Sequence, residues 1–211
     1  MRSVTSVGHG PAPQIPYHAL MDRSSVLGRA FYARPAIEVA RECLGKVLVH
    51  GRVAGRIVET EAYLGVDDRA AHASRGLTGR TRVLFGPPGH AYVYFIYGMY
   101  ECLNFVAEEE GKAGCVLIRA IEPLAGIPDM RRRRPAARRI EDLASGPGKL
   151  TIAMGITRKL NGSDLVNGPL QLRRFHDEPT IEIRVTPRIG ITHCADWPLR
   201  FLVAANRFVS A

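Results

Sequence analysis

The feature that most constrains this chain is the segment 56–65, RIVETEAYLG, which places two carboxylates inside a pattern typical of a β-strand. β-Branched residues crowd its first half, and glycines stand at both ends. Because side chains alternate along a strand, Glu59, Glu61 and Tyr63 fall on one face, and Ile57 is expected there too. Two carboxylates and a phenol on one face are unusual in a core strand, since ionised side chains are rarely buried without partners.

The same spacing also fits a plainer structure, in which the segment is an edge strand with one face in water. Its acids would then pair with Arg52 and Arg56. Surface ion pairs of this kind are common and contribute little to stability. The neighbouring segments must decide between the two structures.

Length and composition indicate one domain. With 211 residues, of which 46% are hydrophobic and 23% charged, the chain can fill one core and is short for two. We expect a flexible leader over residues 1–25, rich in Gly, Pro, Ser and His, and a single domain over 26–211. No stretch resembles a membrane span or a signal peptide. We therefore expect no membrane partner and a protein that works inside the cell.

The net charge of +9 suits a polyanionic partner such as nucleic acid. Most of the positive charge is arginine, which can bind phosphate through two hydrogen bonds. The densest run of positive charge, Arg131 to Arg139, is typical of a solvated helix face or a disordered stretch. The sequence does not decide whether this run contacts phosphate. The four cysteines lie far apart, and the seven histidines show no metal-binding spacing. We expect reduced cysteines in the core, and neither a metal nor a cofactor.

The first part of the chain predicts a helix and a hairpin. Pro35 suits the first turn of a helix that Gly45 can end. The strands 46–50 and 52–63 then form a hairpin that contains the acidic segment. Further strands are expected over 91–96, 100–107, 115–121, 170–173, 181–185, 189–192 and 200–203.

Residues 64–89 lose all periodicity, which in a compact domain indicates a functional or disordered loop. The loop carries His72 and several arginines, among them Arg75, Arg80 and Arg82. That composition suits a loop beside a phosphate backbone, although a solvated basic loop has the same appearance.

A second hairpin, 91–107, has an unusual tip, Tyr97-Gly98-Met99. Turn tips normally carry small polar residues, whereas a bulky exposed tip can act as a wedge between base pairs. The alternative is a hairpin buried in the core, which suits Tyr92 and Phe95 better than Tyr97. Further on, Arg119 lies inside a strand that looks buried and therefore needs a partner.

Residues 145–150, SGPGKL, resemble a phosphate-binding P-loop only faintly. Leu150 replaces the required Ser or Thr, and Leu143 stands where the first glycine belongs. A helix that starts near Lys149, with its N-terminus facing a DNA phosphate, is the better interpretation.

Five blocks, taken in order, resemble the alkyladenine (3-methyladenine) DNA glycosylase family: 57–65 with the following His72, 91–100, 116–124, 145–150 and 187–191. The match covers about residues 31–210, with 66–82 and 193–198 least similar. It implies an α+β fold: one compact domain with a curved, mainly antiparallel sheet, flanking helices and a protruding hairpin that inserts into DNA. It also implies a monomer, located with the genome: in the cytoplasmic nucleoid of a prokaryote or in the nucleus of a eukaryote.

The resemblance implies a role for each matching residue. Glu61 would be the general base that deprotonates a water behind the sugar C1′, with Arg119 and the backbone carbonyl of Ile189 holding that water. Tyr63, His72 and Tyr94 would stack on the flipped purine, and Asn104 would exclude ordinary guanine. Tyr97, with Met99, would fill the space that the flipped base leaves. The DNA backbone would be contacted by Arg75, Arg80, Arg82 and Lys149.

The implied activity is that of a monofunctional DNA glycosylase in base excision repair. Its partner would be double-stranded DNA that contains damaged purines such as 3-methyladenine and 7-methylguanine, with hypoxanthine and ethenoadenine left open. The products would be a free base and an abasic site, which a downstream abasic-site endonuclease would process. No lysine matches a Schiff-base position, so strand cleavage is not expected. A methylated purine carries positive charge, which favours tyrosine faces, and a poorly stacked base costs less to flip.

Two other classes of protein fit part of the pattern. A non-catalytic DNA- or RNA-binding module would use the same basic face and the same tyrosine wedge. A hydrolase of another glycosidic bond would use Glu59 and Glu61 as its two carboxylates, with a separation nearer to that of retaining enzymes. Release of free base from alkylated DNA distinguishes all three classes.

Overall fold

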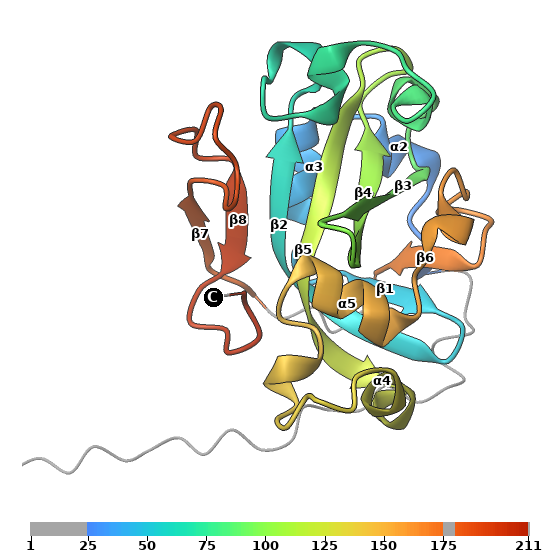
Figure 1. The fold of residues 1–211 in the computed structure, drawn as a ribbon, viewed down its shortest axis with the longest axis vertical. Coiled ribbons are helices and arrows are strands. Elements are labelled where there is room, and N and C mark those ends of the chain that lie inside the picture. The colour runs from blue at the N-terminus through green and yellow to red at the C-terminus, as the bar shows by residue number, and fades with distance from the viewer. Residues whose placement is uncertain (1–24, 175–179, 211) are drawn as a thin grey trace, which may run out of the picture.

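One antiparallel sheet organises the computed structural model, which describes residues 25–174 and 180–210 (Figure 1). Within those residues the strand order is β3-β4-β5-β2-β1-β6, with β8 beside β2 and β7 beside β8. Every neighbouring pair is antiparallel. The strands are β1 Val47–His50, β2 Val53–Tyr63, β3 Ala91–Ile96, β4 Tyr100–Ala107, β5 Gly114–Ala125, β6 Leu170–Arg173, β7 Ile183–Thr186 and β8 Arg200–Val203. The predicted α+β class is confirmed.

Short helices flank the sheet. They are α2 Arg29–Tyr32, α3 Ala36–Glu42, α4 Ile127–Arg133 and α5 Pro147–Met154. Pro35 stands at the N-cap of α3, one residue before the predicted first turn, and α3 ends at Glu42, ahead of the predicted Gly45. Helix α5 begins two residues before Lys149. The arginine run starts on α4, where Arg131, Arg132 and Arg133 are exposed, so that part is a solvated helix face. None of the helices in the described ranges is long and apolar enough to cross a membrane.

Strand β2 lies in the middle of the sheet, so the edge-strand alternative is wrong. Strand β5 pairs along one side of β2, while β1 pairs with the first part of the other side and β8 with the last. The carboxylates of β2 are therefore enclosed, and Arg56 pairs with Glu122 instead of with them.

A β-bulge alters the predicted alternation of side chains. The β2–β5 register shifts on both sides of Glu59, which leaves Val58 and Arg119 without an opposite residue. Ile57 consequently packs in the main core with Ala62, not on the acidic face, and that part of the prediction is wrong. Bulges commonly re-aim side chains next to functional sites.

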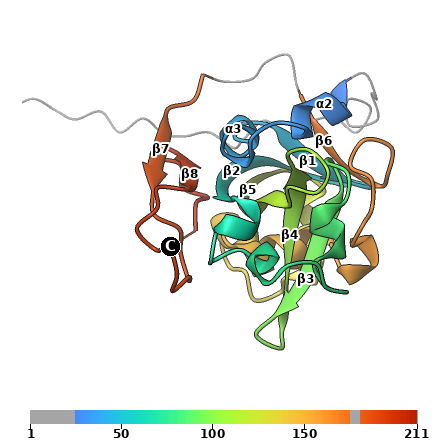
Figure 2. The ribbon, with the colours of Figure 1, turned by 90° about the horizontal axis from the view of Figure 1, so that it is seen from above.

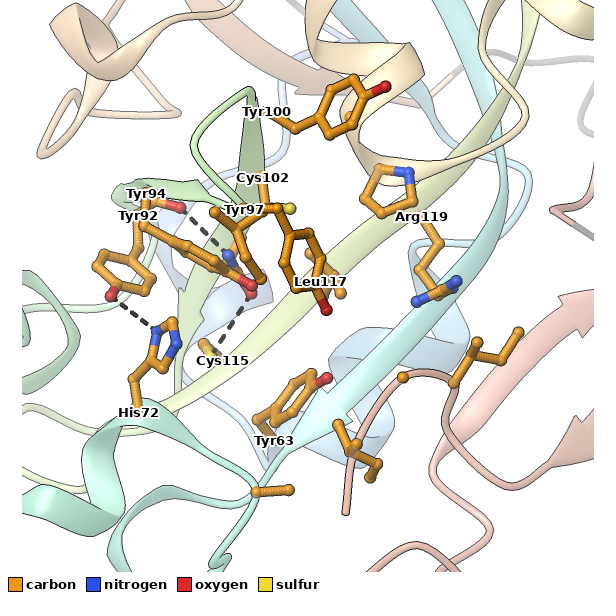
Figure 3. Close-up of a pocket in the computed structure, with 18 of the residues that line it drawn as sticks. Tyr63, His72, Tyr92, Tyr94, Tyr97, Tyr100, Cys102, Cys115, Leu117 and Arg119 are labelled. Carbon is orange, nitrogen blue, oxygen red and sulfur yellow. Dashed lines mark hydrogen bonds between the residues drawn. The ribbon is translucent and has the colours of Figure 1, made fainter. Parts of the chain in front are cut away.

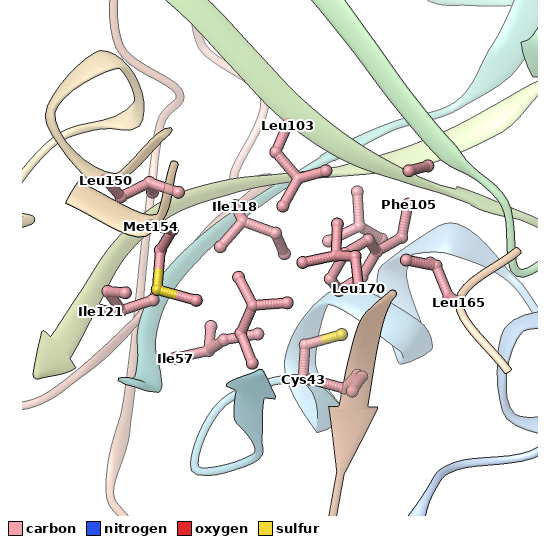
Figure 4. Packing of buried hydrophobic residues seen from close by; sticks show 14 of the residues in the cluster. Cys43, Ile57, Leu103, Phe105, Ile118, Ile121, Leu150, Met154, Leu165 and Leu170 are labelled. Carbon is pink, nitrogen blue, oxygen red and sulfur yellow. The ribbon is translucent and has the colours of Figure 1, made fainter. Parts of the chain in front are cut away.

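The main core lies between the sheet and the helices α3 and α5 (Figure 4). Full burial of a side chain such as Ile57 contributes about 1.5–3 kcal/mol. The one hydroxyl that β2 presents to this side is satisfied, because Thr60 donates 2.8 Å to the carbonyl of Ala40. Cys43, Cys102 and Cys115 are buried and free, as predicted.

The hairpin of β3 and β4 protrudes from the body (Figure 2). Its tip is solvent-exposed, with Tyr97 75% exposed and at a positive φ of 55°. Tyr92 is buried as the core alternative required, but Phe95 is 40% exposed under the guanidinium of Arg158. The hairpin as a whole is therefore not a core element.

Other predictions need correction. Strand β5 does not end at Ile121 as predicted but continues to Ala125. Pro123, which has no N–H to donate, lies opposite Gly55 next to a register shift. Residues 189–192 form no strand. The loop 64–89 is irregular as expected, with the short 3-10 helices η2 Gly65–Asp67, η3 His72–Arg75 and η4 Arg82–Phe85. The predicted leader, apart from its last residue, lies outside the described residues.

Candidate active site

A cavity of about 350 Å³ lies at the base of the protruding hairpin (Figure 3). This volume is at the small end of the range for ligand pockets, about 300–1,000 Å³. Of the predicted site residues, those that line it are Tyr63, His72, Tyr94, Tyr97, Asn104, Arg119 and Ile189. The prediction missed several others, among them Tyr92, Tyr100, Cys102, Cys115 and Leu117.

Aromatic rings form one wall of the cavity, where Figure 3 shows His72, Tyr92 and Tyr94 gathered across from Arg119. The ring centroids of His72 and Tyr94 are 4.5 Å apart, and those of Tyr92 and Tyr94 are 5.4 Å apart. Burial raises the pKa of Tyr94 and of Tyr63, so both phenols stay protonated. Planar aromatic faces of this kind suit a flat ligand ring.

His72 is held in one tautomer. Burial, with Arg80 and Arg75 nearby, lowers the pKa of His72 to about 4, which keeps the imidazole neutral. Arg80 Nη2 lies 3.5 Å from His72 Nε2, and a guanidinium can only donate, so Nε2 accepts. The proton then sits on Nδ1 and is donated to the hydroxyl of Tyr92 over 3.0 Å.

The amide of Asn104 is also fixed in orientation. Its Nδ2 donates 3.3 Å to the carbonyl of Tyr92, and the thiol of Cys115 donates to its Oδ1 over 3.9 Å. Burial raises the pKa of Cys115 to about 12, so the sulfur keeps its proton as a donor.

Glu61 lies behind the cavity lining, with no solvent-exposed side-chain surface. Its Oε1 accepts the backbone N–H of Ile189 at 2.8 Å and lies 3.1 Å from Arg119 Nη1. Its Oε2 accepts the hydroxyl of Tyr63 at 3.0 Å. The predicted role of the Ile189 carbonyl, to hold the water, stays a prediction; the structure adds the amide of Ile189 as a donor to the carboxylate.

Glu59 is equally buried but has a different set of partners. Its Oε1 accepts from Arg119 Nε at 2.9 Å, Arg200 Nε at 2.7 Å and the Ser210 hydroxyl at 2.8 Å. Its Oε2 accepts the backbone N–H of Ser210 at 2.6 Å. This carboxylate is therefore enclosed by donors from β5, β8 and the end of the described chain.

Arg119 bridges the two carboxylates, which supplies the partner that the sequence required. Burial opposes its charge, but Glu61 and Glu59 raise the pKa of Arg119 above its usual value. Because Arg119 also lines the cavity, it brings a fixed positive charge between the buried acids and the cavity.

The predicted DNA-contacting residues lie on the surface around this cavity. Arg75, Arg80, Arg82 and Lys149 are all exposed. Arg80 lies over the Tyr94 ring, 5.3 Å from its centroid. Met99 is 63% exposed beside Tyr97 but does not line the cavity.

Of the missed residues, Tyr92 had a usable signal, because it alternates with Tyr94 along β3 and so points to the same face. Asp68 and Arg188, which form a fully buried ion pair beside Tyr63, had none. They come from two segments without regular secondary structure, far apart in the chain.

The fold and the site define an α+β protein with a tyrosine-lined cavity for a flat ring, next to a buried carboxylate. The methylpurine-DNA glycosylase (MPG) family matches residues 30–207, and the chain belongs to that family. This confirms the predicted family. Membership makes the chain a DNA glycosylase of DNA repair, with DNA as its substrate.

Close relatives carry a consistent name, "putative 3-methyladenine DNA glycosylase". One from Methanocella arvoryzae is 55% identical over 181 residues, which cover 83% of this chain and 89% of the relative. One from Koribacter versatilis is 52% identical over 204 residues, 90% of this chain and 98% of the relative. One from Burkholderia lata is 47% identical over 204 residues, 95% of each chain.

Proposed function

We propose that this glycosylase is monofunctional and acts on damaged purines, with 3-methyladenine and 7-methylguanine as its principal substrates. It flips the base out of duplex DNA, hydrolyses the N-glycosidic bond and leaves an abasic site for an abasic-site endonuclease. It acts as a monomer, in the compartment that holds the genome. The observation that carries the proposal is the buried Glu61 carboxylate directly behind the tyrosine-lined cavity.

Glu61 acts as the general base. One of its oxygens is held by the Ile189 amide and Arg119, while the other has the Tyr63 hydroxyl as its partner. Exchange of that hydroxyl for a water places the water against the carboxylate. The water oxygen bonds to C1′, its proton passes to Glu61, and the C1′–N bond breaks with its electron pair leaving on the base.

The cavity selects bases by charge, shape and stacking. An alkylated purine that carries positive charge is attracted to the faces of Tyr63 and Tyr94. It leaves as a neutral base, which lowers the barrier to bond cleavage. Asn104, held by Tyr92 and Cys115, opposes the exocyclic amino group of ordinary guanine. Poorly stacked lesions cost less to extrude, which widens the range toward neutral damaged bases such as hypoxanthine and ethenoadenine.

The hairpin tip and the basic surface hold the DNA. Tyr97, next to Met99, fills the space that the flipped nucleotide leaves in the stack. Phosphates of the duplex are bound by the exposed cations around the cavity: Arg75, Arg80, Arg82 and Lys149.

Two observations weigh against the alternatives. The carboxylate of Glu59 already accepts four hydrogen bonds and is fully buried, so it is unsuited to act as a second catalytic acid. No lysine is among the described residues that line the cavity, which argues against Schiff-base chemistry and strand cleavage.

The decisive experiment incubates the protein with methylated duplex DNA and separates free bases from polymer by chromatography. We expect free 3-methyladenine and 7-methylguanine and an intact, alkali-sensitive strand. Binding without base release would make the chain a non-catalytic module, and a nicked strand before alkali treatment would contradict the monofunctional mechanism.

A further inference from the structure

A buried ion pair that the proposed mechanism does not use lies beside the cavity. Arg188 follows β7, and Asp68 lies in the irregular loop after β2. Neither side chain has solvent-exposed surface. The guanidinium binds the carboxylate through both of its terminal nitrogens, Nη1 to Oδ2 and Nη2 to Oδ1, the latter at 2.9 Å.

The pair connects two parts of the chain that are distant in sequence, residues 62–70 and the segment after β7. Asp68 accepts the backbone N–H of Leu64 at 3.2 Å and that of Ala70 at 3.1 Å. Arg188 donates 3.0 Å to the carbonyl of Ala62. Since Ala70 lines the cavity, the pair fixes the end of β2, one stretch of the cavity lining and the segment after β7 to one another.

Arg188 is next to both groups that bind Glu61 from this side. Its guanidinium stacks on the Tyr63 ring, 4.6 Å from the centroid, and that ring's hydroxyl donates to Glu61 Oε2. The next residue in the chain is Ile189, whose N–H donates to Glu61 Oε1. Arg188 is therefore adjacent to a donor on each oxygen of the carboxylate.

Stability alone is a poor explanation for such a pair. Removing two charges from water costs several kcal/mol per ion, and a well-packed apolar pair is often at least as stable. A bidentate guanidinium–carboxylate pair does supply geometry, because its two parallel hydrogen bonds fix the guanidinium plane relative to the carboxylate plane.

We propose that Arg188 and Asp68 are positioning residues for the glycosylase reaction. They hold the Tyr63 ring in the cavity wall and the Ile189 amide on Oε1 of Glu61, so that Oε2 faces the water that replaces the Tyr63 hydroxyl. The inference rests on the proposed function and deepens it. Loss of the pair lets the Tyr63 ring and the Ile189 amide move, so Glu61 no longer presents Oε2 to a water at a fixed position. Misplacement of about 1 Å at a reacting group can cost about 100-fold in rate.

The test compares single-turnover excision from lesion duplex at saturating protein with the Kd for the same duplex. We expect Arg188→Met to lower the excision rate by about 10- to 100-fold and to change Kd less than about threefold. Arg56→Met is the matched control. Like Arg188, Arg56 pairs with an acid, in its case Glu122 across β2 and β5. Its side chain is 22% exposed, and neither residue of that pair lines the cavity. That control should lose thermal stability and keep the parental rate.

A double-mutant cycle distinguishes a positioning role that acts through Glu61 from a merely structural role. If Arg188 acts through Glu61, then Arg188→Met combined with Glu61→Gln excises no more slowly than Glu61→Gln alone. Independent losses that multiply would overturn the inference. Should Arg188→Met fail to fold, the neutral pair Asp68→Asn with Arg188→Gln avoids an uncompensated buried charge, and a parental rate in that folded variant also overturns it.

The cycle also separates this inference from the proposed function. If Glu61→Gln itself excises at the parental rate, Glu61 is not the general base and both proposals fail. If Glu61→Gln is slow while the folded Arg188 variants are normal, only the positioning role fails.

Discussion

The hydroxyl of Tyr63 donates a 3.0 Å hydrogen bond to Oε2 of Glu61, so this tyrosine both lines the cavity and binds the candidate general base. The two functions can be separated by substitution. Tyr63→Phe keeps the ring, so we expect parental affinity for lesion duplex. Tyr63→Ala removes a stacking face and should weaken that affinity by about 1–3 kcal/mol. Equal affinities for the two variants in fluorescence anisotropy would show that the ring does not stack on the base.

The two buried acids should respond differently to amide substitution. Glu59→Gln weakens the anchor of Arg119 and Arg200, and we expect the free energy of unfolding to fall by about 3–5 kcal/mol in urea titrations. In the fraction that stays folded, excision should persist. Abolished excision in a folded Glu59→Gln protein would show that the general base has been assigned to the wrong carboxylate.

The hairpin tip distinguishes a base-flipping enzyme from a simple binder. Loss of the exposed Tyr97 ring should let the base return to the stack, a state favoured by a few kcal/mol. Tyr97→Ala should therefore reduce excision strongly in paired duplex and less where the lesion is mismatched. A 2-aminopurine beside the lesion should brighten with the parent and stay dim with the variant.

Met99→Ala is the matched control for that experiment, because Met99 is exposed at the same tip but lies outside the cavity. It should have the smaller effect. Equal fluorescence for parent and Tyr97→Ala, with unchanged duplex excision, would refute the wedge.

Binding to undamaged duplex should weaken steeply with salt. Each phosphate that an arginine neutralises contributes about −0.9 to the slope of log affinity against log salt concentration. Arg75→Ala or Arg82→Ala should reduce the magnitude of that slope by about 1 each. A flat dependence for the parent would argue against phosphate contact by this face.

His72 predicts a loss of stability in acid. Burial, with Arg80 and Arg75, lowers its pKa in the folded protein to about 4 from 6.5, so the unfolded chain binds the proton more readily. The contribution of His72 is complete above about pH 6.5 and is lost as the pH falls toward 4. Urea unfolding at pH 7 and pH 4.5 should show a larger drop for the parent than for His72→Gln. Identical drops would mean that His72 titrates normally.

Local patterns predicted the elements of this fold well. Alternating residues located β3, β4 and β6, and the Tyr97 tip was recognisable because bulky residues occupied a turn. The bulge at Val58 was not predictable, since nothing in the chemistry of that strand shows which residue has no paired residue opposite it on β5. Phe95, which the core alternative would have buried, is 40% exposed, with Arg158 from a distant turn over its ring.

In the site, too, the sequence predicted the contacts of regular strands better than those of irregular segments. Residues on strands could be placed together by alternation, as with Glu61 and Tyr63. Contacts made by irregular segments depend on tertiary packing, so the Arg188–Asp68 pair and the Ile189 amide on Glu61 became visible only in the structure. The predicted strand at 189–192 failed for that reason: its first amide bonds a side chain instead of a neighbouring strand.

The most direct test of the central claim is single-turnover excision of 3-methyladenine by Glu61→Gln, with Kd for lesion duplex measured on the same preparation. The amide keeps the size of the carboxylate but cannot take a proton from water. We expect the Kd to stay near the parental value and the excision rate to fall by about 10²- to 10⁴-fold. An excision rate within a few-fold of the parent would contradict the assignment of Glu61 as the general base.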